Sequence, residues 1–369
     1  MTKTENILKK LIGCDTTCTQ SNVALVDYIE KTLKENGFIT KTFLHPDGKN
    51  KSLLAAFGVG QMKDIQDGLL LSGHIDTVGF DPQTWQTNPL TLTEKNARLY
   101  GRGTVDMKYF TACFLSLLPL KVQKPLFFCL SCDEETGAQG IRQICAFMKE
   151  NNIRPKTALV GEPTDFKLCT ANKGYMALRT VFTGKSGHSS VPQNGINAIS
   201  MAGHFICKID SLNAREMAKG LTLNIGKIAG GTARNCIPEQ VVLEWEIRFP
   251  KKKDFDRIFK KILSFQKEIQ ESYPDSQIET TNNFDLPSFE YHSQSTVRKT
   301  AEKILKTPEI QLAYATEAGF LQGLGADVLV CGAGESDKLH ATDESLKKDD
   351  LFRYRDFLKS FIGDLDKNT

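Results

Sequence analysis

The first part of the chain alternates short apolar runs with segments of helical periodicity. The runs at 68–73 (GLLLSG), 124–132 (KPLFFCLSC) and 157–161 (TALVG) are short and nearly free of charged residues. Helical patterns lie around them, at 20–36, 105–118 and 137–151. Strands that are apolar on both faces are typical of parallel sheets with helices on each side. The sequence therefore predicts an α/β fold with a mostly parallel, mixed sheet covered on both faces.

The middle of the chain has a different pattern. Strand-like segments with one polar face alternate with amphipathic helices in the order strand–helix–strand–strand–helix–strand, at 173–183, 194–210, 221–229, 240–249, 251–272 and 277–282. This order is typical of the split, ferredoxin-like α+β arrangement. The first pattern resumes after about residue 285. We therefore expect a main domain formed by 1–171 and 285–369, with 172–284 inserted as a smaller domain.

Length and composition limit the class of protein. A chain of 369 residues favours two domains over one compact core. The 47 basic and 44 acidic residues leave a net charge of +3, which gives no reason to expect nucleic acid or a membrane as partner. The N-terminal residues lack the pattern of a signal peptide, and no apolar run approaches the roughly 20 residues that span a bilayer. We expect a cytoplasmic protein.

The ten cysteines show no spacing of a disulfide framework. Five of them lie in apolar runs and are predicted to be free, buried thiols: Cys113, Cys129, Cys145, Cys207 and Cys331. Cys129 and Cys132 form a CxxC pair, which leaves a redox or zinc-binding alternative. A strand over 124–132 would point these two side chains to opposite faces, which disfavours that alternative.

Acidic residues and histidines follow the predicted strands. They are His74 and Asp76 in SGHIDTV, Asp106 in GRGTVDMK, Glu134 and Glu135 in CDEETG, Glu162 in VGEPTD and His340 in DKLHATDE. Ligands of parallel sheets gather at the carboxyl ends of the strands, so we expect these side chains at one site. Imidazole nitrogen and carboxylate oxygen are zinc ligands, and paired metals usually share a carboxylate. The set therefore predicts a hydrolase with two metal ions.

Each of these residues alone has a simpler interpretation. His74 and Asp76 could be a structural pair, or the carboxylate could fix the tautomer of a ligating histidine. Asp106 could be an acid in the first turn of a helix. Adjacent acids such as Glu134 and Glu135 are usually solvated, although here they follow a long apolar run and could divide metal binding from proton transfer. The ordered set is more specific than its members.

In this order and at these separations, the residues resemble those of the dizinc aminoacylase and deacylase metallopeptidases. This family includes acetylornithine deacetylase, succinyl-diaminopimelate desuccinylase and carboxypeptidase G-type enzymes. The resemblance extends from about residue 5 to 365, through SGHIDTV, LYGRGTVDMK, DEETGAQG, VGEPTD, KGYMALRTVFTGKSGHSSVPQNGINAI, GGTARNCIP and GAGESDKLHATDESL. The segments GEPTDFK and YATEAGFLQGLGADVLVCGAG are most similar to the acetylornithine deacetylase branch.

The resemblance implies a role for each residue. His74 and Glu162 would bind one zinc ion, Glu135 and His340 the other, and Asp106 would bridge them. Asp76 would orient His74, and Glu134 would be the general base acting on a metal-bridging water. Segment 172–284 would be a lid and dimerisation domain, in which His188 stabilises the oxyanion, in many members across subunits. Arg248 and Asn235 would hold the α-carboxylate of an N-acyl amino acid.

Several alternatives stay open at this point. The metal could be Co²⁺ or Mn²⁺ instead of Zn²⁺, because these ions accept similar ligands. The substrate could be an acetylated, succinylated or peptidic amino acid. Glu317 could bind the δ-ammonium of an ornithine substrate, or it could cap the helix that begins there. A catalytically inactive family member would have lost a ligand or the base, and a nucleotide-binding enzyme would need a glycine-rich phosphate loop that this chain lacks.

Overall fold

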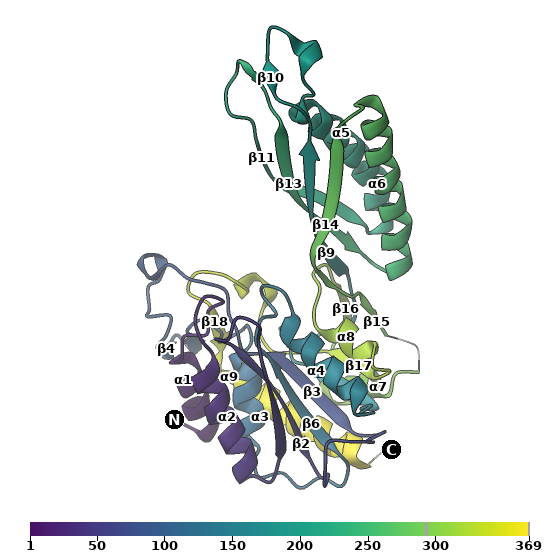
Figure 1. Cartoon of the computed structure of the whole chain (residues 1–369). Helices are drawn as coiled ribbons and strands as arrows, with labels where there is room; N and C mark the ends of the chain where they lie inside the picture. Colours follow the sequence, from purple (N-terminus) through teal and green to yellow (C-terminus); the bar gives the residue numbers. More distant parts are fainter. Residues whose placement is uncertain (292–293, 368–369) are drawn as a thin grey trace. The chain divides into compact units, whose positions relative to one another are not determined.

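A computed structural model describes residues 1–291 and 294–367 and divides the chain into two compact units. Unit 1 consists of Met1–Ala171, Glu290–Leu312 and Thr316–Thr369, and unit 2 of Asn172–Phe289 with Ala313–Ala315 (Figure 1). The second unit thus ends a few residues after 284, because the strand expected over 277–282 runs on to Leu286. Among the described residues, no helix has the length and apolar character needed to cross a membrane.

Unit 1 is built around a nine-stranded sheet. Its order is β1-β2-β6-β3-β7-β17-β8-β15, with β16 beside β8. The strands are β1 (Ile39–Leu44), β2 (Lys51–Phe57), β3 (Leu69–His74), β6 (Leu126–Ser131), β7 (Thr157–Val160), β8 (Leu168–Asn172), β15 (Phe289–Glu290), β16 (Glu309–Leu312) and β17 (Asp327–Val330). The neighbouring pairs β6–β3, β3–β7 and β7–β17 are parallel, whereas β1–β2, β2–β6 and β17–β8 are antiparallel. The predicted mostly parallel, mixed sheet is confirmed.

Helices enclose the central strands, so every residue of β3 and β6 is buried. The helices of this unit are α1 (Lys3–Ile12), α2 (Val23–Glu35), α3 (Lys108–Ser116), α4 (Gln139–Glu150), α7 (Thr296–Leu305), α8 (Ala318–Gln322) and α9 (Lys348–Lys367). A small three-stranded sheet, in the order β18-β5-β4, lies beside them: β4 (Thr93–Lys95), β5 (Arg98–Tyr100) and β18 (Ser345–Lys347). Helix α3 packs so closely on the sheet that any side chain at Gly73 or Gly161 would collide with Phe110. That close contact lies where β3 and β7 end.

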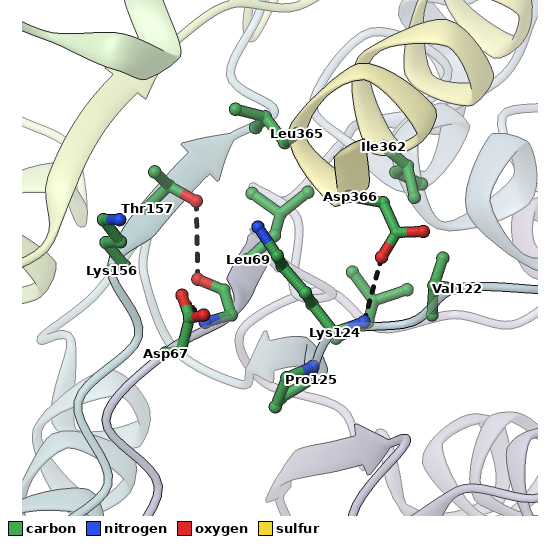
Figure 2. Close-up of a pocket in the computed structure, with 12 residues that line it drawn as sticks. Asp67, Leu69, Val122, Lys124, Pro125, Lys156, Thr157, Ile362, Leu365 and Asp366 are labelled. Atoms are coloured by element: carbon green, nitrogen blue, oxygen red, sulfur yellow. Dashed lines mark hydrogen bonds between the residues drawn. The ribbon is translucent and has the colours of Figure 1, made fainter. Parts of the chain in front are cut away.

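The opposite ends of the same strands surround a small cavity. Leu69, Leu126 and Thr157, at the beginnings of β3, β6 and β7, line it together with Ile362 and Leu365 of α9 (Figure 2). Its volume of about 20 Å³ is room for about one water molecule. The cavity is therefore too small for a substrate and lies at the edge of the sheet away from the residues singled out above.

Unit 2 is a four-stranded antiparallel sheet in the order β11-β13-β9-β14, with two helices on one side (Figure 1). Its elements are β9 (Gly174–Thr183), β10 (Gly187–His188), α5 (Ala198–Glu216), β11 (Thr222–Gly230), β12 (Cys236–Ile237), β13 (Gln240–Phe249), α6 (Lys252–Ser272) and β14 (Gln277–Leu286). Alternate residues of β9 are buried, which matches a strand with one face toward the helices. The order of strands and helices is the ferredoxin-like one.

One prediction about the cysteines was wrong. All ten are free, and Cys113, Cys129, Cys145 and Cys331 are buried, but Cys207 is exposed. Cys207 lies on α5, whose buried face is formed by residues such as Phe205 and Ile209. The apolar run around it misled the prediction because a helix covering one face of a sheet buries only one side.

Candidate metal centre

The register of the parallel strands brings the predicted residues to one edge of the unit 1 sheet. Ser72 of β3 lies beside Val160 of β7, and Val160 lies beside Val330 of β17. The strands therefore end together, so the chain leaves β3 at His74 and leaves β7 just before Glu162. The polar side chains converge because the carboxyl ends of parallel strands share an edge.

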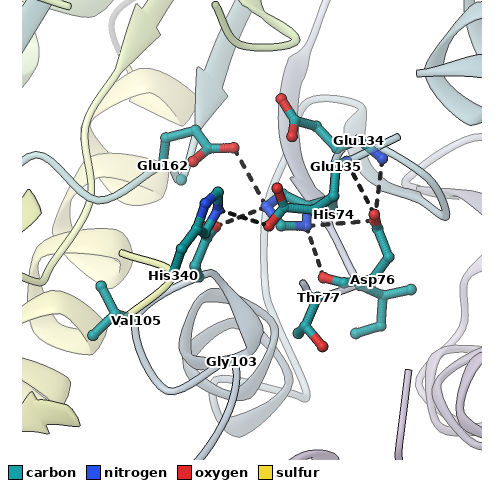
Figure 3. A network of polar contacts seen from close by, with 12 residues as sticks. His74, Asp76, Thr77, Gly103, Val105, Glu134, Glu135, Glu162 and His340 are labelled. Carbon is teal, nitrogen blue, oxygen red and sulfur yellow. Dashed lines mark hydrogen bonds and ion pairs between the residues drawn. The ribbon is translucent and has the colours of Figure 1, made fainter. Parts of the chain in front are cut away.

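The first cluster consists of His74, Asp106 and Glu162, all buried. His74 Nε2 lies 2.9 Å from Asp106 Oδ1 and 3.6 Å from Glu162 Oε1 (Figure 3). The potential ligand atoms of the three residues lie within 4.8 Å of one another. One imidazole and two carboxylates around a common point fit a divalent cation such as Zn²⁺.

The second cluster consists of Asp106, Glu135 and His340. His340 Nε2 lies 3.1 Å from Glu135 Oε1 and 3.2 Å from Asp106 Oδ2 (Figure 3). Asp106 thus directs one carboxylate oxygen to each histidine. Such a shared carboxylate is typical of two-metal sites, and the residues of this chain fit a pair of divalent cations.

The electrostatics of the two clusters favour positive charge. Burial, together with the charge of Asp106, raises the pKa of Glu162 to about 8. Hydrogen bonds to Asp106 and Glu135 raise the pKa of His340 to about 10. Burial opposes ionisation of Asp106, but hydrogen bonds from His340 and His74 hold its pKa below the usual range. A divalent cation would have to displace the protons of Glu162 and His340, because metal ligands must be deprotonated.

Glu134 belongs to neither cluster. It is half-buried next to them, and burial and the charge of Glu162 raise its pKa well above the usual range. A carboxylate with a raised pKa, close to a metal site but not part of it, is suited to moving protons.

Asp76 contacts both His74 and the segment that carries the two glutamates. His74 Nδ1 lies 3.0 Å from the backbone oxygen of Asp76 and 3.5 Å from its carboxylate. The carboxylate oxygens accept the backbone N–H groups of Glu134 (3.2 Å) and Glu135 (3.1 Å). The main chain of Asp76 is therefore the nearer partner of the imidazole, and its side chain holds the turn that follows β6.

Asp133 shapes the same turn, and the sequence interpretation missed it. Its carboxylate accepts the backbone N–H groups of Gln139 (2.8 Å) and Gly140 (2.7 Å) at the beginning of α4. Its backbone oxygen accepts the N–H of Ala138 at 2.8 Å. Three consecutive acidic residues thus have three different environments, which the letters CDEETG alone do not reveal.

Glu317 is not at the surface. The side chain is 1% exposed, and Oε2 accepts the hydroxyl of Ser72 on β3 at 3.0 Å. Glu317 occupies the position before α8 but makes no capping hydrogen bond with its side chain. Neither the predicted contact with a substrate ammonium nor the alternative of a helix cap is supported by this position.

The three remaining predicted residues lie in unit 2. His188 and Asn235 are exposed and line one cavity, and the backbone oxygen of Asn235 accepts the N–H of Ser189 at 3.1 Å. Arg248 lies on β13, stacked over Tyr175 at 4.8 Å, and its Nε donates to Glu246 at 2.7 Å.

Comparison with known proteins identifies the family. The family model described as peptidase family M20/M25/M40 matches residues 70–364, which is most of the chain. The chain belongs to this family. Its M20 relatives include the acetylornithine deacetylase of Salmonella typhimurium, 35% identical over 345 residues that cover 89% of this chain and 87% of that protein. The acetylornithine deacetylase of Buchnera aphidicola is 33% identical over 340 residues, with the same coverage of both proteins.

Solved structures of other hydrolases share the fold. A tripeptidase from Staphylococcus aureus superposes with a TM-score of 0.80 at 18% identity, over 99% of this chain and 98% of that one. A dinuclear metal-binding peptidase of the M20 family from Bacillus subtilis has a TM-score of 0.70 at 16% identity, with the same coverage. The chain is an M20-family hydrolase, and its two ligand clusters lie where the strands of this fold end.

Proposed function

We propose that this M20 hydrolase removes the acetyl group from N²-acetyl-L-ornithine, releasing L-ornithine and acetate, with two divalent metal ions. The observation that carries the proposal is the pair of ligand clusters that share Asp106. The substrate is inferred from relatives at 33–35% identity that are named acetylornithine deacetylase. The reaction would be a step of arginine biosynthesis.

His74 and Glu162 would hold one ion, Glu135 and His340 the other, and Asp106 both. When bound, the ions would polarise the amide carbonyl and lower the pKa of the attacking water. Zn²⁺ suits these nitrogen and oxygen ligands, and Co²⁺ is an alternative.

Glu134 would carry the proton. As water adds to the carbonyl carbon, the Glu134 carboxylate takes a proton from it, and the carboxylic acid then gives that proton to the departing amine nitrogen. The carbon–nitrogen bond breaks, and acetate and the free α-amine result. Asp76 supports this step because its carboxylate fixes the backbone of Glu134.

Arg248 and Asn235 would bind the α-carboxylate of the substrate, and His188 would stabilise the oxyanion. Arginine suits this task because its planar guanidinium can donate two hydrogen bonds to one carboxylate. Within unit 2, however, Arg248 lies near one end of β13, whereas His188 and Asn235 line a cavity at the other end of that strand. Arg248 pairs with Tyr175, whereas Gln240 pairs with Thr183 and lines the same cavity as His188. The eight residue steps from Gln240 to Arg248 span about 26 Å along the strand, which is more than the length of an acylated amino acid.

Two copies of the chain would resolve this separation, and we propose a homodimer formed through unit 2. His188 and Asn235 of one copy would then complete the site to which the Arg248 of the other copy contributes. The strand β11 supports this arrangement because it is an edge strand with mostly exposed residues. Ile228 on β11 and Ile199 on α5 are 54% and 46% exposed. An edge with unpaired backbone groups and exposed apolar side chains suits pairing with a second copy.

The substrate proposal is tested with metal-depleted protein reloaded with Zn²⁺ or Co²⁺. We expect a strong chelator to abolish activity and either ion to restore it. Among N-acetyl amino acids, N-succinyl-diaminopimelate and small peptides, acetylornithine should have the highest kcat/KM. Full activity in metal-free protein would refute the metal-dependent mechanism, and faster turnover of succinyl-diaminopimelate or a peptide would refute the substrate.

Subunit mixing tests the role of His188. The variants His188→Ala and Glu134→Ala should each be nearly inactive alone. After subunit exchange, we expect about a quarter of the wild-type activity, because half of the dimers are then mixed and each has one intact site. A mass-tagged copy would measure the exchange. Complete exchange without recovered activity would show that His188 does not act across subunits.

A further inference from the structure

Glu344 is a fully buried carboxylate that the proposed reaction does not use. Its Oε1 accepts the backbone N–H groups of Val105 at 2.6 Å and Asp106 at 3.0 Å. Its Oε2 accepts the backbone N–H of Gly103 at 2.9 Å and Nη1 of Arg102 at 2.9 Å. Two donors on each oxygen occupy the four acceptor positions of a carboxylate.

The main chain of Glu344 binds the same loop. Its backbone oxygen accepts the N–H of Gly101 at 3.1 Å and the hydroxyl of Thr104 at 3.3 Å. The loop 101–106 is therefore held along its length by one residue, and it ends at Asp106. These contacts restrict the backbone conformations that the loop can adopt.

Glu344 also lies close in sequence to His340, another residue of the second cluster. It follows His340 by four residues, so the segment that carries His340 is joined through Glu344 to the loop that carries Asp106. Arg102 strengthens the junction, because its guanidinium pairs with Glu344 and lies 5.2 Å from the ring of Trp85. Glu344 thus connects the segments that carry two of the three residues in the cluster of Asp106, Glu135 and His340.

The four donors explain why glutamate occupies this position. In a glutamine, one oxygen would be replaced by an NH₂ group, which would face either the N–H groups of Val105 and Asp106 or those of Gly103 and Arg102. The NH₂ group of the glutamine would then face N–H donors on one side, and the loop would have to move. Neighbouring groups of this kind orient metal ligands, and their loss typically costs about 10–100-fold in metal affinity.

We propose that Glu344 is a positioning residue for the metal centre, which sets the geometry of Asp106 relative to His340 and thereby the affinity of the second cluster for its ion. It acts through the backbone of Asp106 and has no role in proton transfer or substrate contact. The inference rests on the proposed two-metal function.

The chain offers a control in the neighbouring strands β5 and β18. Glu335 accepts Nη2 of Arg98 at 2.8 Å and pairs with Lys347 at 2.7 Å. Both of these partners lie outside loop 101–106. Glu335→Gln therefore removes an ion pair of the same chemistry from the same region. Glu344→Gln keeps the size of the side chain, and Glu344→Asp keeps its charge but shortens it.

The experiment titrates metal-depleted protein with Co²⁺, following bound metal and the visible cobalt spectrum, with Tm as a check of folding. We expect two binding steps in the wild type and in Glu335→Gln. In folded Glu344→Gln, one step should weaken by about 10–100-fold with an altered cobalt spectrum, and the other should change less. Glu344→Asp should bind more tightly than Glu344→Gln, and saturating Co²⁺ should restore most of kcat with KM for the substrate unchanged.

The outcomes separate this inference from the proposed function. A wild-type protein that binds fewer than two ions would refute the two-metal function itself. If the wild type binds two and Glu344→Gln binds both within about twofold of it, Glu344 has no positioning role. A fall in Tm with unchanged Co²⁺ affinity and spectrum would likewise assign Glu344 to stability alone. If Glu344→Gln does not fold, equal affinities in Glu344→Asp and the wild type would overturn the inference.

Discussion

Replacing Glu134 by glutamine is expected to lower kcat by about 10²–10⁴-fold while the protein keeps two metal ions. The amide has nearly the shape of the acid but cannot take a proton from water or return one to the leaving amine. Metal binding should persist because Glu134 is outside both ligand clusters. The measurements are kcat at saturating substrate and the metal content of the same sample after removal of free metal.

The neighbouring residue is the control for this prediction. Glu135 has the same chemistry and lies on the same turn, but its Oε1 is 3.1 Å from His340 Nε2 within the second cluster. Glu135→Gln should therefore lose metal together with activity, and added metal should restore part of that activity. Added metal should not restore Glu134→Gln. A Glu134→Gln protein that loses metal, or that turns over within tenfold of the wild type, would contradict the assigned role.

Much of the fold could be predicted because it follows from local patterns. The apolar runs that became β3, β6 and β7 are buried on both faces, which is typical of parallel strands in a sheet enclosed by helices. The end of β3 at His74 and the end of β7 before Glu162 follow from where each run ends. Because parallel strands end at one edge, residues far apart in sequence could be assigned to one site.

The contacts that support the site could not be predicted in this way. Glu344 and Asp106 are 238 residues apart, and nothing in ATDESL distinguishes Glu344 from an acid on the surface. The same limit applies to Glu317: nothing in ATEAGF indicates that its side chain is buried and accepts the hydroxyl of Ser72. Both contacts escape sequence analysis for one reason: the partner of a buried carboxylate is supplied by the three-dimensional fold, not by its neighbours in sequence.

Asp106→Asn should affect both metal ions, because Asp106 is shared by the two clusters. Its Oδ1 lies 2.9 Å from His74 and its Oδ2 lies 3.2 Å from His340, whereas asparagine offers only one oxygen and no charge. We expect kcat/KM to fall by more than about 100-fold, beyond the loss typical of residues that only orient ligands. Asp81→Asn, a change of the same chemistry at an exposed residue of unit 1, should have little effect.

Thermal unfolding separates the loss of a ligand from misfolding in Asp106→Asn. A metal that binds only the folded state stabilises it, so the wild-type Tm should rise when metal is added to the depleted protein. In Asp106→Asn that rise should be much smaller at the same metal concentration, while the metal-free protein still unfolds cooperatively. The rise in Tm should be smaller for the binding of both ions, because each ion loses the carboxylate that the clusters share. A variant with the full wild-type rise in Tm, and two ions bound at wild-type affinity, would show that Asp106 does not bridge the metals.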